Sequence, residues 1–150
     1  MKNTHGTFIY PDEYEKASNS YLMSTVTVIA GLPLPIVNVL AGLGFYLANR
    51  KASYFVRWHC IQAVLSQVLM LPFNSILLAW TLSYFWDGFP GVSNTYIIYA
   101  FTVLTLNVIE FLSVLLTAIK VRNGGNPRWP VLAGITDRLT STDNRDKFRI

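Results

Sequence analysis

Charged residues are scarce in this chain, because Asp, Glu, Lys and Arg together make up only 13% of its 150 residues. That is about half the share usual in globular domains. A soluble domain of this length has a large surface relative to its volume and needs more charge to cover it. Hydrophobic residues instead reach 52%. A surface that faces lipid removes the conflict, so the composition predicts a single-domain membrane protein.

Cysteines and catalytic motifs are equally sparse. Cys60 is the only cysteine, which excludes an internal disulfide. The sequence contains none of the short motifs typical of metalloproteases, serine hydrolases, phosphate-binding loops or dithiol oxidoreductases. His59 precedes Cys60 directly, but adjacent helical residues point about 100° apart and do not share a metal or thiol site. We therefore expect no enzymatic activity, no cofactor and no metal.

Three long apolar stretches account for most of the chain. They run over residues 17–49, 54–86 and 95–119, and each exceeds the roughly 20 residues that a membrane helix needs. They predict an all-α integral membrane helix bundle with three spans. A short amphipathic helix within residues 131–140 would follow at the membrane interface, with its apolar residues on one face. Those residues are Leu132, Ile135 and Leu139.

The first stretch is broken between Gly31 and Pro35, where the sequence reads Gly-Leu-Pro-Leu-Pro. Two prolines in alternation remove helical donors and disfavour helix in the residue before each. Either one kinked span results, or two half-helices re-enter the membrane and raise the number of membrane helices to four. We expect a polar tail at residues 1–20, without the apolar core of a signal peptide. The bundle then occupies residues 21–140, and a second polar tail covers residues 141–150.

Basic residues gather on one side of these stretches. They cluster after the first stretch and again after the third, whereas the loop at residues 86–94 has neither Lys nor Arg. The positive-inside rule therefore places the C-terminus in the cytoplasm. The N-terminus lies outside for three crossings and inside for a re-entrant pair. Bases that flank apolar spans indicate lipid headgroups rather than nucleic acid. The expected headgroup anchors are Arg50, Lys51, Arg128 and Trp129.

Glu110 lies deep inside the third stretch, ten residues before Lys120 and so about 15 Å from its end at helical rise. The second and third stretches run antiparallel, and matching their depths places Glu110 beside three polar residues of the second. These are Gln62, Ser66 and Gln67, with His59 closer to the cytoplasm. Glu110 either handles a proton or ion, or is protonated and orients the two helices through hydrogen bonds.

A short motif lies at the start of the second stretch. An Arg is followed by an aromatic residue and a His, and a Gln-Ala pair comes after two further residues. The members of this motif include Arg57, His59, Gln62 and Ala63. The motif resembles one of small bacterial membrane proteins related to the central subunit of the chloroplast inner-envelope import translocon, the Tic-twenty family. Residues 125–131 and the Gly-Leu-Pro-Leu-Pro break are also similar. The resemblance implies a helical protein of the bacterial inner membrane, with a part in protein translocation.

Two functions are compatible with these features. The first is a non-catalytic subunit of a larger inner-membrane assembly, linked through the resemblance to protein translocation. Its partners would be other membrane protein subunits and lipids. The alternative is a small oligomeric transporter or channel that uses Glu110, since broken helices such as the first stretch often line substrate sites. A homo-oligomer would suit either function.

Overall fold

The computed structural model describes residues 8–29, 35–86, 88 and 91–141. Within these residues the chain is all-helical, with five helices and no strand, which confirms the all-α prediction. The helices are α1 (Pro11–Ile29), α2 (Pro35–Ala48), α3 (Tyr54–Trp86), α4 (Asn94–Arg122) and α5 (Leu132–Ser141).

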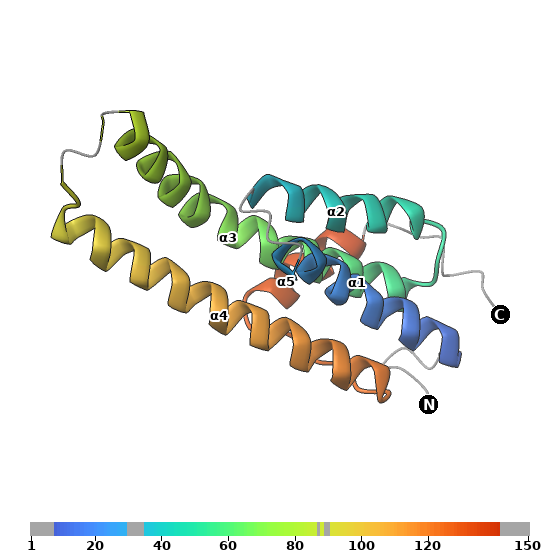
Figure 1. Cartoon of the computed structure of the whole chain (residues 1–150). Helices are drawn as coiled ribbons and strands as arrows, with labels where there is room; N and C mark the ends of the chain where they lie inside the picture. The colour runs from blue at the N-terminus through green and yellow to red at the C-terminus, as the bar shows by residue number, and fades with distance from the viewer. Residues whose placement is uncertain (1–7, 30–34, 87, 89–90, 142–150) are drawn as a thin grey trace.

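Helices α3 and α4 form a long antiparallel hairpin whose tip extends beyond the other helices (Figure 1). They contain 33 and 29 residues, which corresponds to about 50 and 43 Å at helical rise. Both are long and apolar enough to cross a membrane. Their bounds lie within a few residues of the second and third stretches that the sequence indicated. Ser93 caps the start of α4 by accepting a hydrogen bond from the backbone N–H of Tyr96.

Helix α1 packs between the first half of α3 and the second half of α4 (Figure 1). Two hydrogen bonds fix its register. The Ser18 hydroxyl donates to the carbonyl of Ala118 at 2.9 Å, and the Tyr21 hydroxyl lies 2.9 Å from His59 Nδ1. Helix α1 therefore runs from the end of the hairpin where α3 begins and α4 ends, toward its middle.

Helix α2 packs against α3 and α1 and returns toward the start of α3. Glycine permits the close approach, because a Cβ added at Gly42 would lie 3.2 Å from Val64 Cγ2. The expected break between Gly31 and Pro35 lies largely outside the described residues, which omit 30–34. On either side α1 ends at Ile29 and α2 begins at Pro35, so the first apolar stretch contains two helices.

The expected N-terminal tail is shorter than the sequence indicated. Helix α1 begins at Pro11, ten residues before the predicted boundary of the bundle. Ala17, Ser18 and Ser20 are buried between neighbouring helices. Small residues let helices approach closely, and the sequence alone did not show that these three are packed.

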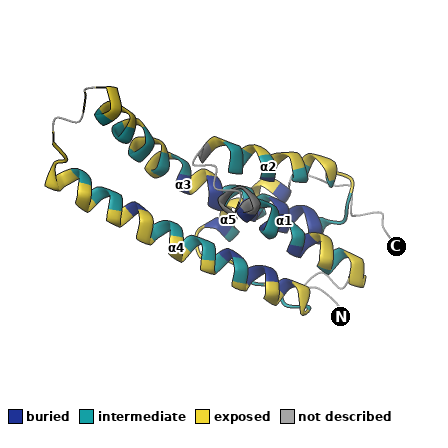
Figure 2. Cartoon of the chain, in the orientation of Figure 1, coloured by how far each residue is buried: buried dark blue, intermediate teal, exposed yellow. Residues whose placement is uncertain are grey.

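Exposed and intermediate residues predominate along α2 and α4, as Figure 2 shows, and polar side chains share the interior of the bundle with apolar ones. Many of the buried side chains are polar, including Tyr21, His59, Gln62, Ser66 and Gln67. The outward faces are apolar instead: Leu40 of α2 and Leu104 of α4 are 58% and 59% exposed. Other large apolar residues exposed on these helices are Ile36, Leu43, Leu47, Ile98, Phe101, Val108, Leu112 and Leu116. A continuous apolar surface of this extent marks an interaction or membrane surface.

Candidate functional site

The centre of the bundle contains a hydrogen-bonded group formed by Tyr21, His59 and Gln62, all fully buried. Gln62 Nε2 donates to the Tyr21 hydroxyl oxygen at 2.9 Å, which leaves the phenol proton to donate to His59 Nδ1. The rings of Phe55 and Trp58 pack edge to face against the imidazole, with centroid distances of 4.5 and 5.0 Å. These contacts fix the three polar side chains in one arrangement.

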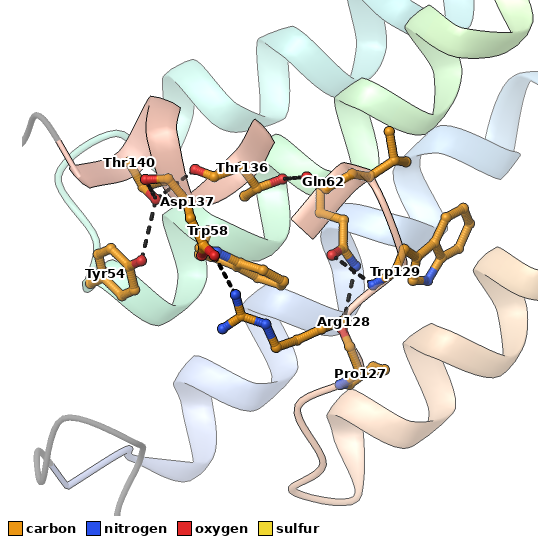
Figure 3. Close-up of polar contacts among 10 residues, drawn as sticks. Tyr54, Trp58, Gln62, Pro127, Arg128, Trp129, Thr136, Asp137 and Thr140 are labelled. Carbon is orange, nitrogen blue, oxygen red and sulfur yellow. Dashed lines mark hydrogen bonds and ion pairs between the residues drawn. The ribbon is translucent and has the colours of Figure 1, made fainter. Parts of the chain in front are cut away.

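Gln62 also joins this group to the segment that follows α4 (Figure 3). Its amide nitrogen lies 3.4 Å from the carbonyl oxygen of Pro127, and its side-chain oxygen accepts from the backbone N–H of Trp129 at 3.3 Å. The Trp129 indole donates in turn to Thr117 Oγ1 at 2.8 Å. One buried glutamine thus connects α1, α3 and the C-terminal segment.

Glu110 forms a second polar contact farther along the hairpin. Its Oε1 atom accepts hydrogen bonds from Gln67 Nε2 at 2.6 Å and from Ser66 Oγ at 3.2 Å. Of the residues that the sequence grouped around Glu110, the structure places Ser66 and Gln67 there. His59 and Gln62 instead contact Tyr21, because α1 separates α3 from α4 at their level.

A third contact links α3 and α4 nearer the tip of the hairpin. Asn74 and Asn107 exchange hydrogen bonds, with each side-chain nitrogen donating to the other residue's oxygen at 3.1 and 2.7 Å. The sequence analysis missed this pair and Tyr21. The two asparagines could have been found by matching depths along the two apolar helices, as was done for Glu110. Tyr21 could not, because its helix was assigned to a span of unknown course.

The C-terminal segment packs against the first turns of α3 (Figure 3). The Trp58 indole donates to Asp137 Oδ1 at 2.8 Å, and Arg128 forms an ion pair with the other carboxylate oxygen. The Arg128 guanidinium also lies 5.1 Å from the centroid of the Trp58 ring, within range of a cation–π contact. The hydroxyl oxygens of Thr140 and Tyr54 lie 3.3 Å apart. Asp137 is therefore the residue that fastens α5 to α3.

Two of the expected headgroup anchors contact other parts of the protein. Arg128 pairs with Asp137 and is half exposed, and the Trp129 indole donates to Thr117. Arg57, a member of the motif at the start of α3, is only 3% exposed. Ala63, another member of the motif, is buried in the core as a helix-packing residue. Arg50 and Lys51, the other two expected headgroup anchors, are exposed between α2 and α3.

Replacing Asp137 with alanine is expected to loosen α5. The change leaves the buried Trp58 N–H without its acceptor, which costs about 1–2 kcal/mol, and the half-exposed ion pair adds little. Trypsin cleavage of the detergent-solubilised protein after Arg128 or Arg138 should then accelerate about five- to thirty-fold. Asp12→Ala, which removes an exposed pair with Lys16, is the control and should leave the rate unchanged. Equal rates for both variants would contradict the assigned role of Asp137.

The chemistry available to these groups is hydrogen bonding between helices. Within the described residues, no three His, Cys, Asp or Glu side chains gather closely enough to hold a metal ion. Each of the polar contacts joins two or more helices or the C-terminal segment. The arrangement therefore fixes the relative positions of the helices in a mostly apolar molecule.

The chain matches a protein-family model over most of its length. Residues 17–135, which are 119 of the 150 residues, match the model described as the magnetosome magnetite crystal formation protein family. No curated protein and no solved structure matches the chain. The expected relation to the import translocon is therefore wrong, and the link to protein translocation rested on it. The motif around Arg57 comprises only a few residues, so it carries less information than a match over 119 residues.

Proposed function

This chain belongs to the magnetosome magnetite crystal formation protein family, and on that basis we propose that it is an integral protein of the magnetosome membrane. We further propose that it contributes to magnetite crystal formation as a non-catalytic subunit of a membrane assembly. The observation that carries the membrane placement is the apolar outer surface of the bundle. Leucine, isoleucine and phenylalanine are exposed along α2 and α4, while polar side chains such as Gln62 are buried at its centre beside apolar ones.

Membrane placement explains both halves of this pattern. In lipid, apolar side chains gain nothing from burial, so the interior of a helix bundle uses close packing and hydrogen bonds instead. Polar groups such as Gln62 and Glu110 would be costly against acyl chains and therefore face inward. In water the same molecule would expose an apolar surface along the whole length of α4.

The proposed topology has two spans and one re-entrant pair. Helices α3 and α4 cross the membrane, and the segment of α4 from Tyr96 to Lys120 measures about 36 Å, enough to span a 30 Å hydrocarbon core with a tilt. Helices α1 and α2 enter and leave at the end where α3 begins.

The two ends of the hairpin differ in composition, and this difference sets the orientation. At the tip, Tyr96 packs against Trp80 and Tyr84 with ring centroids 5.7 and 4.9 Å apart, an aromatic cluster suited to the headgroup level. At the other end lie all the Lys and Arg residues of the described chain. The positive-inside rule then places the first residue of α1 and the whole of α5 on the cytoplasmic side.

A non-catalytic role is supported by the use made of the polar groups. Glu110 accepts hydrogen bonds from two side chains of α3, an arrangement that supports a helix-packing role over an ion pathway. The extensive apolar surfaces of α2 and α4 offer room for other membrane subunits as well as for lipid. We propose that such partners are how the chain influences the crystal.

Deletion of the gene in a magnetite-forming host tests this proposal. We expect smaller or fewer crystals in electron micrographs, with recovery when the wild-type gene is restored. The epitope-tagged protein should remain with magnetosome membranes after a wash with high salt. A variant at an exposed position, Ser83→Ala, should restore the crystals fully. Unchanged crystals after deletion, or release of the protein into the soluble fraction, would contradict the proposal.

A further inference from the structure

Helix α5 has its polar face turned inward and its apolar face turned outward. Thr136 and Thr140 are buried, at 0% and 3% exposure, whereas Ile135 and Leu139 are 42% and 56% exposed. A surface helix of a soluble protein has the opposite arrangement. The sequence grouped Leu132 with the two outward residues, but Leu132 is buried, and the outward face is continued by Val131 just before the helix.

The inward face of α5 is fully used by protein contacts. Both buried threonines donate to backbone carbonyls one turn earlier, at 2.8 and 2.7 Å. Asp137 accepts from Trp58, and Thr140 contacts Tyr54. Because the later residue of α5 meets the earlier residue of α3, the two helices run antiparallel. Helix α5 thus lies beside the first turns of α3, at the basic end of the hairpin.

The outward face includes a base. Arg138 is exposed next to Leu139. Further exposed bases at this end of the molecule are Arg50, Lys51, Lys120 and Arg122. A face that combines aliphatic side chains with basic ones fits the boundary between acyl chains and anionic headgroups.

We propose that α5 is embedded in the cytoplasm-facing leaflet and gives the protein a preference for anionic lipids. Val131, Ile135 and Leu139 lie among the upper acyl chains, and Arg138 lies at the lipid phosphates. This inference rests on the proposed membrane function. It adds a third lipid contact to those of the two spans, because lipid would cover the outward face of α5.

Spin labels on single cysteines test the depth of this face. Ile135→Cys and Leu139→Cys would be made in a Cys60→Ala background and reconstituted into vesicles of phosphatidylcholine and phosphatidylglycerol. Leu104→Cys on the exposed face of α4 is the lipid-side control, and Glu15→Cys on α1 is the water-side control. We expect oxygen to relax the labels at 135 and 139 as at 104, and a water-soluble nickel chelate to relax them far less than at 15.

Two outcomes of the labelling would contradict the embedding of α5, and a third would contradict the proposed membrane function. Nickel access at 135 and 139 equal to that at 15 would overturn the embedding of α5. Protection from both reagents would also overturn it, because a protein partner would then cover the face. Nickel access at 104 would contradict the membrane function itself.

The charge preference needs a second measurement, made with spin-labelled phosphatidylglycerol and phosphatidylcholine. We expect Arg138→Gln to lower the preference for phosphatidylglycerol about two- to five-fold, because one base near an anionic surface contributes roughly that much. Lys16→Gln, whose lysine is paired with Asp12 on α1, is the matched control and should leave the preference unchanged. Equal preferences in wild type and Arg138→Gln would overturn the role of Arg138.

Discussion

Replacing Gln62 with leucine should lower the free energy of unfolding by about 2–4 kcal/mol, since it removes hydrogen bonds from several buried groups at once. Gln62 is fully buried and contacts the Tyr21 hydroxyl, the Pro127 carbonyl and the Trp129 N–H. Leucine has nearly the same volume, so the change isolates the polar contacts from packing. It would also release the C-terminal segment from the centre of the bundle.

The measurement is unfolding of the purified protein in mixed micelles by increasing detergent denaturant. Tyr21→Phe provides a graded control, because it removes one hydroxyl and keeps the ring, and it should cost only about 1 kcal/mol. Cleavage by trypsin in the C-terminal segment should also accelerate in Gln62→Leu and stay near wild type in Tyr21→Phe. A stability of Gln62→Leu within error of the wild type would show that Gln62 does not connect these elements.

Replacing Glu110 with glutamine should leave the free energy of unfolding nearly unchanged, whereas replacing it with leucine should lower that free energy. Glutamine keeps a side-chain oxygen for Gln67 and Ser66, so Glu110→Gln should change the free energy of unfolding by less than about 0.5 kcal/mol. Leucine leaves the Gln67 amide without its acceptor in the bundle interior, at a cost of about 1–3 kcal/mol.

Magnetite formation in the host distinguishes a packing role of Glu110 from an ionisable one. If Glu110 only joins α3 to α4, the Gln variant should support crystals of normal size, while the Leu variant should not. Normal assembly with loss of crystal formation in Glu110→Gln would show that the acidic proton itself is needed. That result would contradict the assignment of Glu110 to helix packing.

The two long helices could be predicted closely from the sequence. The stretch at 54–86 coincides with α3, and that at 95–119 lies within α4, because long apolar runs bounded by turn residues leave few alternatives. Depth matching also indicated that Glu110 would lie near Ser66 and Gln67. Each of these inferences depends on only one helix or on two that are adjacent in the chain.

The course of α1 could not be predicted in the same way. Its first half contains acidic and small polar residues, so hydropathy assigned it to a tail, and only tertiary packing shows that Ser18 and Tyr21 are buried. Helix α1 lies between α3 and α4, and its Tyr21 binds His59 and Gln62. These two residues therefore contact α1 rather than Glu110, around which the sequence had grouped them. Helical spacing of Ala17, Ser18 and Tyr21 was a signal for a packed face, but it did not identify the neighbouring helices.

The central claim is that α1 and α2 enter and leave the membrane on the same side, next to the hairpin of α3 and α4. Single cysteines at Glu15, Lys51 and Val92, in a Cys60→Ala background, test it with a membrane-impermeant maleimide on isolated magnetosome vesicles. We predict that positions 15 and 51 react on intact vesicles and that position 92 reacts only after detergent is added. Reaction at 51 with protection at both 15 and 92 would mean that the first apolar stretch crosses the membrane once, and would contradict the account.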